Sequence, residues 1–420
     1  MDSLHWRVPT RTIHVVLAGL ICLCGGQPAA ATDSESIRIY LDADLTVAKS
    51  AGVSIERGLR TALSEIDNRL QGRPVELVLK DHRGSSPRSK HHLEQYLADK
   101  SALAVISGLH SPPLLAHREF INKAGILVLD PWAAAGPITR YPGPENWIFR
   151  LSVDDTKAGQ VIVRHALEVL GCERPFLLLE DTGWGKSNER TMTAALDAAG
   201  VAPVGTAIFS WNLSTPRARA LLREIAASSA DVILLVANAA EAQTFIEQMI
   251  ELDLLLPIAS HWGITGGTFT DIIGASMRER VQLSFIQTRF SFISHPQDAL
   301  GLQVLQRART LFPGQITEAA DIDAPTGFIH AYDLMRILIA AVRQAGLTGD
   351  IAQDRRAVRI ALENLEEPVQ GLVKTYSRPF RPFDADHPDA HEALTIDDLV
   401  MAGYGPHGEI ILTTTTGLQR

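Results

Sequence analysis

Short apolar segments that alternate with amphipathic ones limit the fold of this chain more than any other feature of its sequence. Residues 37–41 form the first apolar run, and the segment 53–70 that follows carries Ile55, Leu59 and Leu63 at helical spacing. Strands separated by helices in this way predict parallel sheets with crossover helices. Because the strands are almost wholly apolar, helices are expected to cover both faces of each sheet.

The alternation occurs in two series, which the Pro- and Gly-rich stretch 136–146 separates. We therefore predict an α/β fold with two lobes of similar design. The first series predicts strands at 37–41, 75–80, 103–107 and 126–129 and helices at 53–70, 87–98 and 112–124. The second series predicts helices at 156–170, 186–199, 216–228 and 240–252 and strands at 176–180, 204–209, 231–236 and 257–260. A strand at 281–286, helices at 298–312, 324–345 and 353–364, and short strands within 372–412 are expected to follow.

The first 31 residues have the pattern of a cleaved secretory signal peptide. Arg7 and Arg11 precede an apolar stretch at 13–23, which is too short to span a bilayer comfortably. The small residues before Thr32 form a cleavage site, and we place the cut after Ala31. The protein is therefore expected to be periplasmic, with no direct membrane insertion after cleavage.

Cysteine usage agrees with an exported protein that is stabilised by its core alone. Cys22 and Cys24 fall within the signal, where the large residues that precede them make lipidation the weaker alternative. Only Cys172 remains after cleavage, so no intrachain disulfide is expected. A length of 420 residues is sufficient for two lobes with substantial cores.

The charge pattern excludes one class of partner. The formal net charge is −9, and no run of lysines and arginines is present. Nucleic-acid binding requires a basic face, so we expect no nucleic-acid partner.

Several segments together resemble one family. They are the opening strand, GVSIERGLRTALSEIDNR, KDHRGSSPRSKHHLEQYLAD, VISGLHSPPLLAHREFINKAGILVLDPWAAAG, LLLEDTGWG, ADVILLVANAAEAQTFIEQM and HAYDLMRILIAAVRQAG. In their order and spacing they resemble type I periplasmic solute-binding proteins of the branched-chain amino acid and amide class, the leucine-binding protein-like receptors of ABC importers. The resemblance extends over essentially the whole chain after the signal.

The resemblance implies two Rossmann-like lobes joined by a three-crossing hinge, with the ligand caught between them. The crossings are expected near 151–155, 286–290 and 373–378. The first lobe is then formed by residues 32–153 and 288–375. The second lobe is formed by residues 154–287, and residues 376–420 complete this lobe and the hinge. The family implies a small-molecule ligand, permease subunits of an ABC transporter as partners, no cofactor and no enzymatic activity.

Family members bind their ligand with loops that follow the strands, which places candidate residues in this chain. His110 and Ser111 follow the strand at 103–107, and Ser111 is predicted to cap the next helix and leave backbone N–H groups for a ligand carboxylate. Trp132, Ala133 and Ala134 follow the strand at 126–129, where the backbone is implied to contact the ligand. Ala134 occupies the position at which the family usually has a threonine.

The second lobe supplies further candidates at the ends of its strands. Trp184 matches an aromatic position that lies against the ligand in the family. Asn238 either faces the ligand or caps the helix at 240–252. Trp262 follows the strand at 257–260 beside His261, where amino-acid receptors have an acidic residue. With three tryptophans and no acid, we expect an apolar, aromatic or cationic ligand rather than a standard branched-chain amino acid.

Four alternatives remain beside the importer receptor. A receptor that feeds a signalling partner has the same sequence features, and a secreted α/β hydrolase would use Ser111 as its nucleophile. Gly185-Lys186-Ser187 resembles the end of a phosphate-binding loop, but Glu180 stands where that loop needs glycine. The Asp- and His-rich segment 384–391 matches no metal signature and is predicted to be a solvated acidic loop.

Overall fold

The computed structural model describes residues 36–143, 145–267, 269–293 and 297–413. The predicted signal peptide, with Cys22 and Cys24, lies outside the described residues. Within the described part, no helix has both the length and the apolarity that a membrane crossing requires. The single described cysteine, Cys172, is a buried free thiol.

The first lobe is built on a six-stranded sheet with the strand order β2-β3-β1-β4-β5-β6. All neighbours are parallel except the β2–β3 hairpin. The strands are β1 (Ile37–Ala43), β2 (Arg69–Leu70), β3 (Arg73–Asp81), β4 (Ala102–Ser107), β5 (Val128–Asp130) and β6 (Ile148–Arg150).

The second lobe is built on a seven-stranded sheet with the order β15-β14-β11-β10-β9-β7-β8. Its first five strands in the chain are parallel, and the last two add to the edge in antiparallel pairing. The strands are β7 (Pro175–Glu180), β8 (Gly205–Phe209), β9 (Val232–Val236), β10 (Ile258–Ser260), β11 (Leu283–Thr288), β14 (Leu399–Tyr404) and β15 (Ile410–Leu412). A separate small hairpin joins β12 (Val369–Gln370) and β13 (Thr375–Tyr376).

Helices connect the strands and cover the sheets. Those of the first lobe are α1 (Lys49–Ser64), α2 (Ser86–Ala98), α3 (Ser111–Ala124), α10 (Ala299–Leu311), α11 (Pro325–Ala345) and α12 (Ile351–Glu363). Those of the second lobe are α4 (Asp155–Arg164), which continues as a π-helical turn, α5 (Gly183–Ala198), α6 (Thr215–Ala227), α7 (Ala239–Glu251), α8 (Phe269–Ile272) and α9 (Ala275–Arg278). The predicted α/β fold with mostly parallel sheets in two lobes is confirmed.

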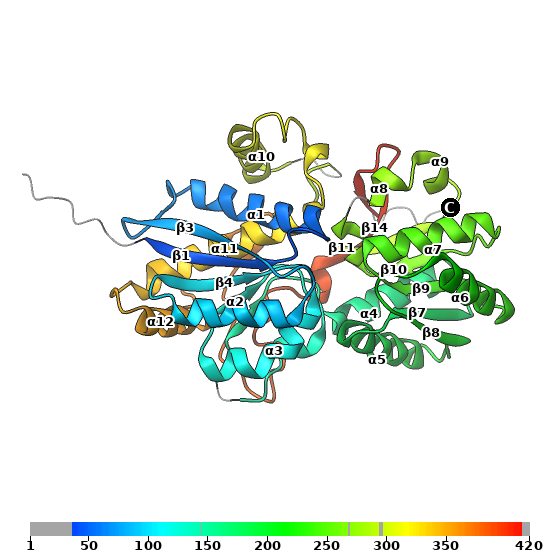
Figure 1. Ribbon diagram of the computed structural model, residues 1–420, viewed down its shortest axis with the longest axis horizontal. Coiled ribbons are helices and arrows are strands. Elements are labelled where there is room, and N and C mark those ends of the chain that lie inside the picture. The colour runs from blue at the N-terminus through cyan, green and yellow to red at the C-terminus, as the bar shows by residue number, and fades with distance from the viewer. Residues whose placement is uncertain (1–35, 144, 268, 294–296, 414–420) are drawn as a thin grey trace, which may run out of the picture. The chain divides into compact units, whose positions relative to one another are not determined.

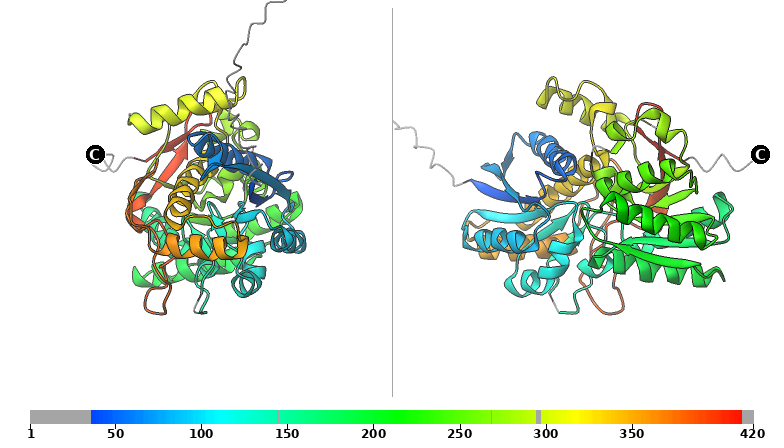
Figure 2. Two further views of the ribbon diagram at one scale, coloured as in Figure 1. Left: turned by 90° about the vertical axis from the view of Figure 1, so that its left-hand side faces the viewer. Right: turned by 45° about the vertical axis from the view of Figure 1, so that its right-hand side comes forward.

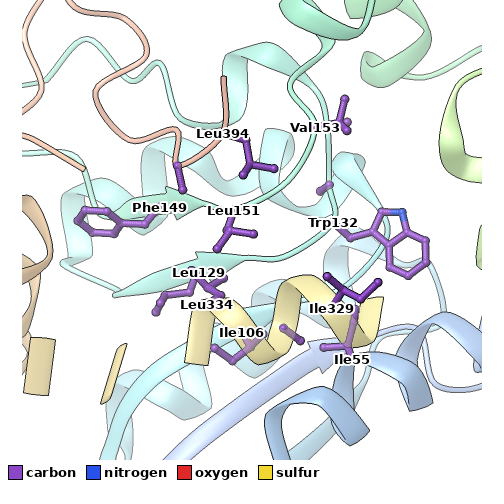
Figure 3. Packing of buried hydrophobic residues seen from close by; sticks show 14 of the residues in the cluster. Ile55, Ile106, Leu129, Trp132, Phe149, Leu151, Val153, Ile329, Leu334 and Leu394 are labelled. Atoms are coloured by element: carbon purple, nitrogen blue, oxygen red, sulfur yellow. The ribbon is translucent and has the colours of Figure 1, made fainter. Parts of the chain in front are cut away.

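Segments far apart in the sequence complete each lobe. The late helix α11 packs against α1 and returns the chain to the first lobe, and β14 pairs with β11 in the second (Figures 1 and 2). Figure 3 shows α11 contributing Ile329 and Leu334 to the core beside Ile106 of β4 and Leu129 of β5. Trp132 lies to one side of the labelled residues of this cluster (Figure 3).

Local turn chemistry corrects two predicted boundaries. The helix predicted at 53–70 ends at Ser64, because Asp67 and Asn68 adopt positive φ angles of 51° and 53° in a turn into β2. The helix predicted at 186–199 begins three residues earlier, because Thr182 accepts hydrogen bonds from the amides of Trp184 and Gly185. The strand β6 was not predicted.

The third passage between the lobes lies later than the expected 373–378. Residues beyond Tyr376 stay against the first lobe, where Phe380 packs on Phe149 with ring centroids 5.1 Å apart. Arg150 and Glu392 form a parallel bridge in the same region. The chain joins the second sheet only at β14, so 376–394 belongs with the first lobe instead of the second.

Candidate functional site

Side chains from both lobes line one small cavity at the carboxyl ends of the parallel strands. This is the edge at which ligands bind in open α/β sheets. The lining residues are Leu109, His110, Ser111, Pro112, Trp132 and Ala134 from the first lobe and Glu180, Trp184, Asn238, Trp262 and Gly263 from the second. The cavity measures about 10 Å³, which is about the room that one water molecule requires.

All the predicted site residues except Ala133 line this inner cavity. The Ala133 amide donates to Asp130 Oδ1 at 2.8 Å, and its carbonyl accepts from Arg150 at 3.2 Å. Its backbone groups are thus engaged within the protein, so the expected ligand contact of Ala133 is not supported. For the other residues, the structure establishes that they lie together, and ligand contact stays a prediction.

Three tryptophans form much of the wall. The rings of Trp132 and Trp262 come from different lobes and meet edge to face, with centroids 6.1 Å apart. Trp184 lies in the first turn of α5 and donates from its indole nitrogen to Asp155 Oδ1 at 3.1 Å. The indole N–H of Trp132 is buried and has no hydrogen-bond partner among the described residues. A buried donor without a partner is costly, so this N–H marks a position where a ligand or water would be stabilised.

Ser111 does not cap α3 as predicted. His110 occupies the N-cap position, and Ser111 is the first helical residue. The hydroxyl of Ser111 accepts a hydrogen bond from the amide of Ala135 at 3.2 Å. Pro112 and Pro113 follow and have no N–H groups, so this helix terminus offers fewer donors to an anion than most.

Glu180 is a wall residue whose role the sequence did not reveal. Glu180 is the last residue of β7 and is 1% exposed. Thr182 donates to one carboxyl oxygen at 2.7 Å, and Asn238 donates to the other at 2.8 Å. Burial raises the pKa of Glu180 to about 7, against the effect of these hydrogen bonds. The described residues that line the cavity include no lysine or arginine, so this carboxyl has no cationic partner among them.

The Asn238 side chain therefore bonds to the cavity wall and does not cap α7. It occupies the N-cap position of α7, but its side chain makes no capping hydrogen bond. The bond to Glu180 takes its place. Of the two predicted roles, the structure rules out side-chain capping.

An acidic residue does lie beside His261, although it comes from another part of the chain. Asp155 Oδ1 is 3.1 Å from His261 Nε2, without the alignment of a hydrogen bond, and both side chains are fully buried. The second carboxyl oxygen of Asp155 has no partner among the described residues. His261 Nδ1 accepts from the amide of Trp262 at 2.9 Å. The sequence placed no acid here because Asp155 approaches from the start of α4.

A buried arginine holds the loop that carries Trp132. Arg150 ends β6 and donates to the carbonyls of Ala133 and Ala135 at 3.2 and 2.9 Å. The same guanidinium pairs with both carboxyl oxygens of Glu392, at 2.9 and 2.6 Å. It also reaches Asp154, which lies in the first passage to the second lobe. The network therefore connects the wall of the cavity to the passage between the lobes.

The segment 384–391 is solvated only in its first half. Asp384 and His387 are exposed and bond to each other at 2.8 Å. His391 is fully buried and donates from Nδ1 to the carbonyl of Ile148 at 2.9 Å. Its Nε2 lies 3.2 Å from Glu363 Oε1, and its ring stacks on Phe149 with centroids 4.0 Å apart. The predicted solvated loop is thus wrong for His391, which helps to pack this segment on the first lobe. Among the described residues, no group of three His, Cys, Asp or Glu side chains could hold a metal ion.

The segment 185–187 lies within α5 and does not form a phosphate cradle. Thr182 caps the helix terminus, and the Ser187 hydroxyl accepts from the amide of Gly136 in the first lobe at 3.2 Å. The buried carboxyl of Glu180 lies at the same terminus. These contacts give no support to nucleotide binding.

The sequence family described as periplasmic binding protein matches residues 41–393. No curated protein sequence matches the chain. The fold resembles the periplasmic binding protein type 1 from Bordetella pertussis Tohama I, with a TM-score of 0.74 and 16% identity over 90% of this chain and 100% of that one.

Two further structures were solved with ligands. The branched-chain amino acid transporter substrate-binding protein from Streptococcus pneumoniae, in complex with isoleucine, has a TM-score of 0.71 and 18% identity over 90% of this chain and all of that one. A solute-binding protein from R. palustris, in complex with benzoate, has a TM-score of 0.71 and 16% identity over 90% of this chain and 95% of that one. The predicted resemblance is confirmed: the chain belongs to the periplasmic binding protein family and has the type I fold.

Proposed function

We propose that this protein is an extracytoplasmic receptor that captures a small molecule between its two lobes and delivers it to an ABC-type importer. The observation that carries the proposal is the cavity whose wall combines side chains from both lobes. A ligand in such a position makes contacts that exist only when the lobes are together, so binding favours closure. The closed form is then the one that permease subunits recognise.

The wall favours an apolar, aromatic or cationic ligand over a standard branched-chain amino acid. Three tryptophans surround the cavity, and Ala134 stands where the family has a threonine. Structures of similar fold were solved with isoleucine and with benzoate, so the fold itself does not fix the ligand.

The hydrolase alternative finds no support in the site. The Ser111 hydroxyl bonds to a backbone amide, and the imidazole of His110 bonds to Asp44 at 3.2 Å. Within the described part of the chain, no hydrogen bond joins the Ser111 hydroxyl to an imidazole that would activate it. A sensor that feeds a signalling partner would use the same cavity, and loss of solute uptake on deletion of the gene distinguishes an importer receptor from it.

A thermal-shift screen tests the proposal directly. The exported chain is screened against amino acids, amides, aromatic acids and quaternary amines. A ligand at about 100 times its dissociation constant adds roughly 2.7 kcal/mol of stability, which is a measurable shift in Tm. Ser111→Ala is expected to weaken binding without changing any turnover. If no class of solute stabilises the chain, or if a solute is consumed and Ser111→Ala abolishes its turnover, the receptor proposal is wrong.

A further inference from the structure

A second, larger chamber adjoins the inner cavity and shares Leu109, His110 and Asn238 with it. Its volume is about 310 Å³, at the lower end of the range for small-molecule sites. Both lobes contribute to the outer chamber: Asp44, Val47 and Arg83 lie on one side and Trp211, Glu241 and Phe269 on the other. The inner cavity holds about one water molecule, so the body of a ligand fits only in the outer chamber.

Trp211 is the aromatic wall of the outer chamber, and the sequence did not single it out. It lies between β8 and α6, in the second lobe, yet its ring centroid is 5.2 Å from that of His110 in the first. A Cβ atom at Gly84 would lie 3.3 Å from the ring, so glycine permits this close approach. The Trp211 indole N–H is buried near Glu180 but forms no well-aligned hydrogen bond. Trp211 thus lines the chamber, and its indole nitrogen lies near a buried carboxyl.

Acidic side chains outnumber cations around this chamber. Glu241 is 7% exposed and accepts one hydrogen bond, from the amide of Asn212 at 2.9 Å. It lies close enough to Glu180 for the two carboxyls to repel each other. Asp44 is buried and bonds to His110. Among the described residues of the wall, Arg83 is the only lysine or arginine, and it pairs with Asp81. Glu180 and Glu241 thus have no cationic side chain bonded to them among the described residues.

The helix termini at the site offer few backbone donors to an anion. The prolines after Ser111 remove N–H groups from the start of α3, and Thr182 already caps α5. The wall of the chamber has apolar surface from Leu109, Val47 and Phe269. These features match a positive group with an apolar body and not a carboxylate.

We propose that the ligand is an organic cation whose ammonium group lies between the Glu180 and Glu241 carboxyls and the face of Trp211, with its apolar body in the outer chamber. This inference rests on the proposed receptor function and names the ligand class of the same cleft.

Matched ligands test the charge requirement. Calorimetry and tryptophan fluorescence are used with benzyltrimethylammonium and choline, against the neutral choline isostere 3,3-dimethylbutanol and against benzoate. Binding of at least one ammonium compound at least tenfold tighter than the neutral isostere and benzoate is expected. Tighter binding of benzoate or the neutral isostere overturns the cation assignment but leaves the receptor function standing. Failure of every solute class to bind overturns both.

Matched variants test the position of the cation. Glu241→Gln and Trp211→Ala are each expected to weaken ammonium binding roughly tenfold, and Trp211→Phe to restore part of it. Glu251→Gln is the control, because Glu251 lies at the far end of α7, where it is exposed and paired with Arg219. Glu180→Gln provides a second test of the site if Glu241→Gln does not fold. Unchanged affinity in folded variants at Glu241, Glu180 and Trp211 overturns the assignment.

Discussion

At the scale of single residues, Glu180 is a buried acidic group in the wall of the candidate site. It is a carboxyl at the end of an apolar strand, held by Thr182 and Asn238 and facing an aromatic cavity. The tryptophans of this cavity are predictable from the sequence, because they stand directly after predicted strands. The roles of Glu180, Asp155 and Trp211 are not, because each depends on a partner from a distant part of the chain. Such pairings leave no local pattern.

The raised pKa of Glu180 predicts a specific dependence of stability on pH. The folded chain retains the proton up to about pH 7, while the unfolded chain releases it near its ordinary pKa of 4.5. The folded state therefore binds more protons in this window, and stability falls as pH rises from about 4.5 to 7. The contribution is about 3 kcal/mol at most.

Glu180→Gln removes this pH-dependent contribution to stability, because it replaces the carboxyl with an amide of similar shape that does not titrate. Urea unfolding of both proteins at pH 5 and pH 8 measures it. The variant is expected to be close to wild type at pH 5 and more stable than wild type at pH 8. An equal difference in unfolding free energy at the two pH values would show that Glu180 titrates normally.

At the scale of elements, the short strand β6 and the segment 384–392 together hold the loop that carries Trp132. Arg150 bonds to Glu392 and to the loop carbonyls, and His391 packs behind them on Phe149. The sequence predicted the long strands and helices to within a few residues, since their apolar periodicity is set locally. It did not predict β6, whose three residues follow the Pro- and Gly-rich stretch and carry no periodicity of their own.

Breaking this buried pair is expected to be costly. Glu392→Gln leaves the charge of Arg150 only partly compensated, since Asp154 remains, and is expected to lower the free energy of unfolding by about 3 kcal/mol. Asp389→Asn is the matched control, because Asp389 is half-exposed in its pairs with Arg140 and Lys157 and is expected to contribute at most about 1 kcal/mol. Chemical denaturation compares the two variants. Similar losses of unfolding free energy in the two variants would contradict the role of the buried Arg150–Glu392 pair in holding this loop.

At the scale of the whole molecule, the two lobes meet around the candidate site. Trp132 contacts Trp262, His110 contacts Trp211, and the Gly136 amide donates to Ser187 across the cleft. The inner cavity has room for only about one water molecule, so a ligand enters when the lobes move apart. The two lobes were predicted from the sequence, but the third passage of the chain between them was predicted too early, at 373–378. The segment 376–394 shows no strong apolar periodicity, and its buried contacts with Phe149 and Arg150 decide where it lies.

Small-angle X-ray scattering of the exported chain, with and without the solute that most raises its Tm, tests the central claim most directly. If the solute is captured between two closing lobes, the radius of gyration falls on saturation with ligand. The fall is expected to be absent in Trp132→Ala and Trp262→Ala, one from each lobe, at ligand concentrations that saturate wild type. An unchanged scattering curve at saturating ligand would contradict the account. So would an affinity that is unchanged by the substitution in either lobe.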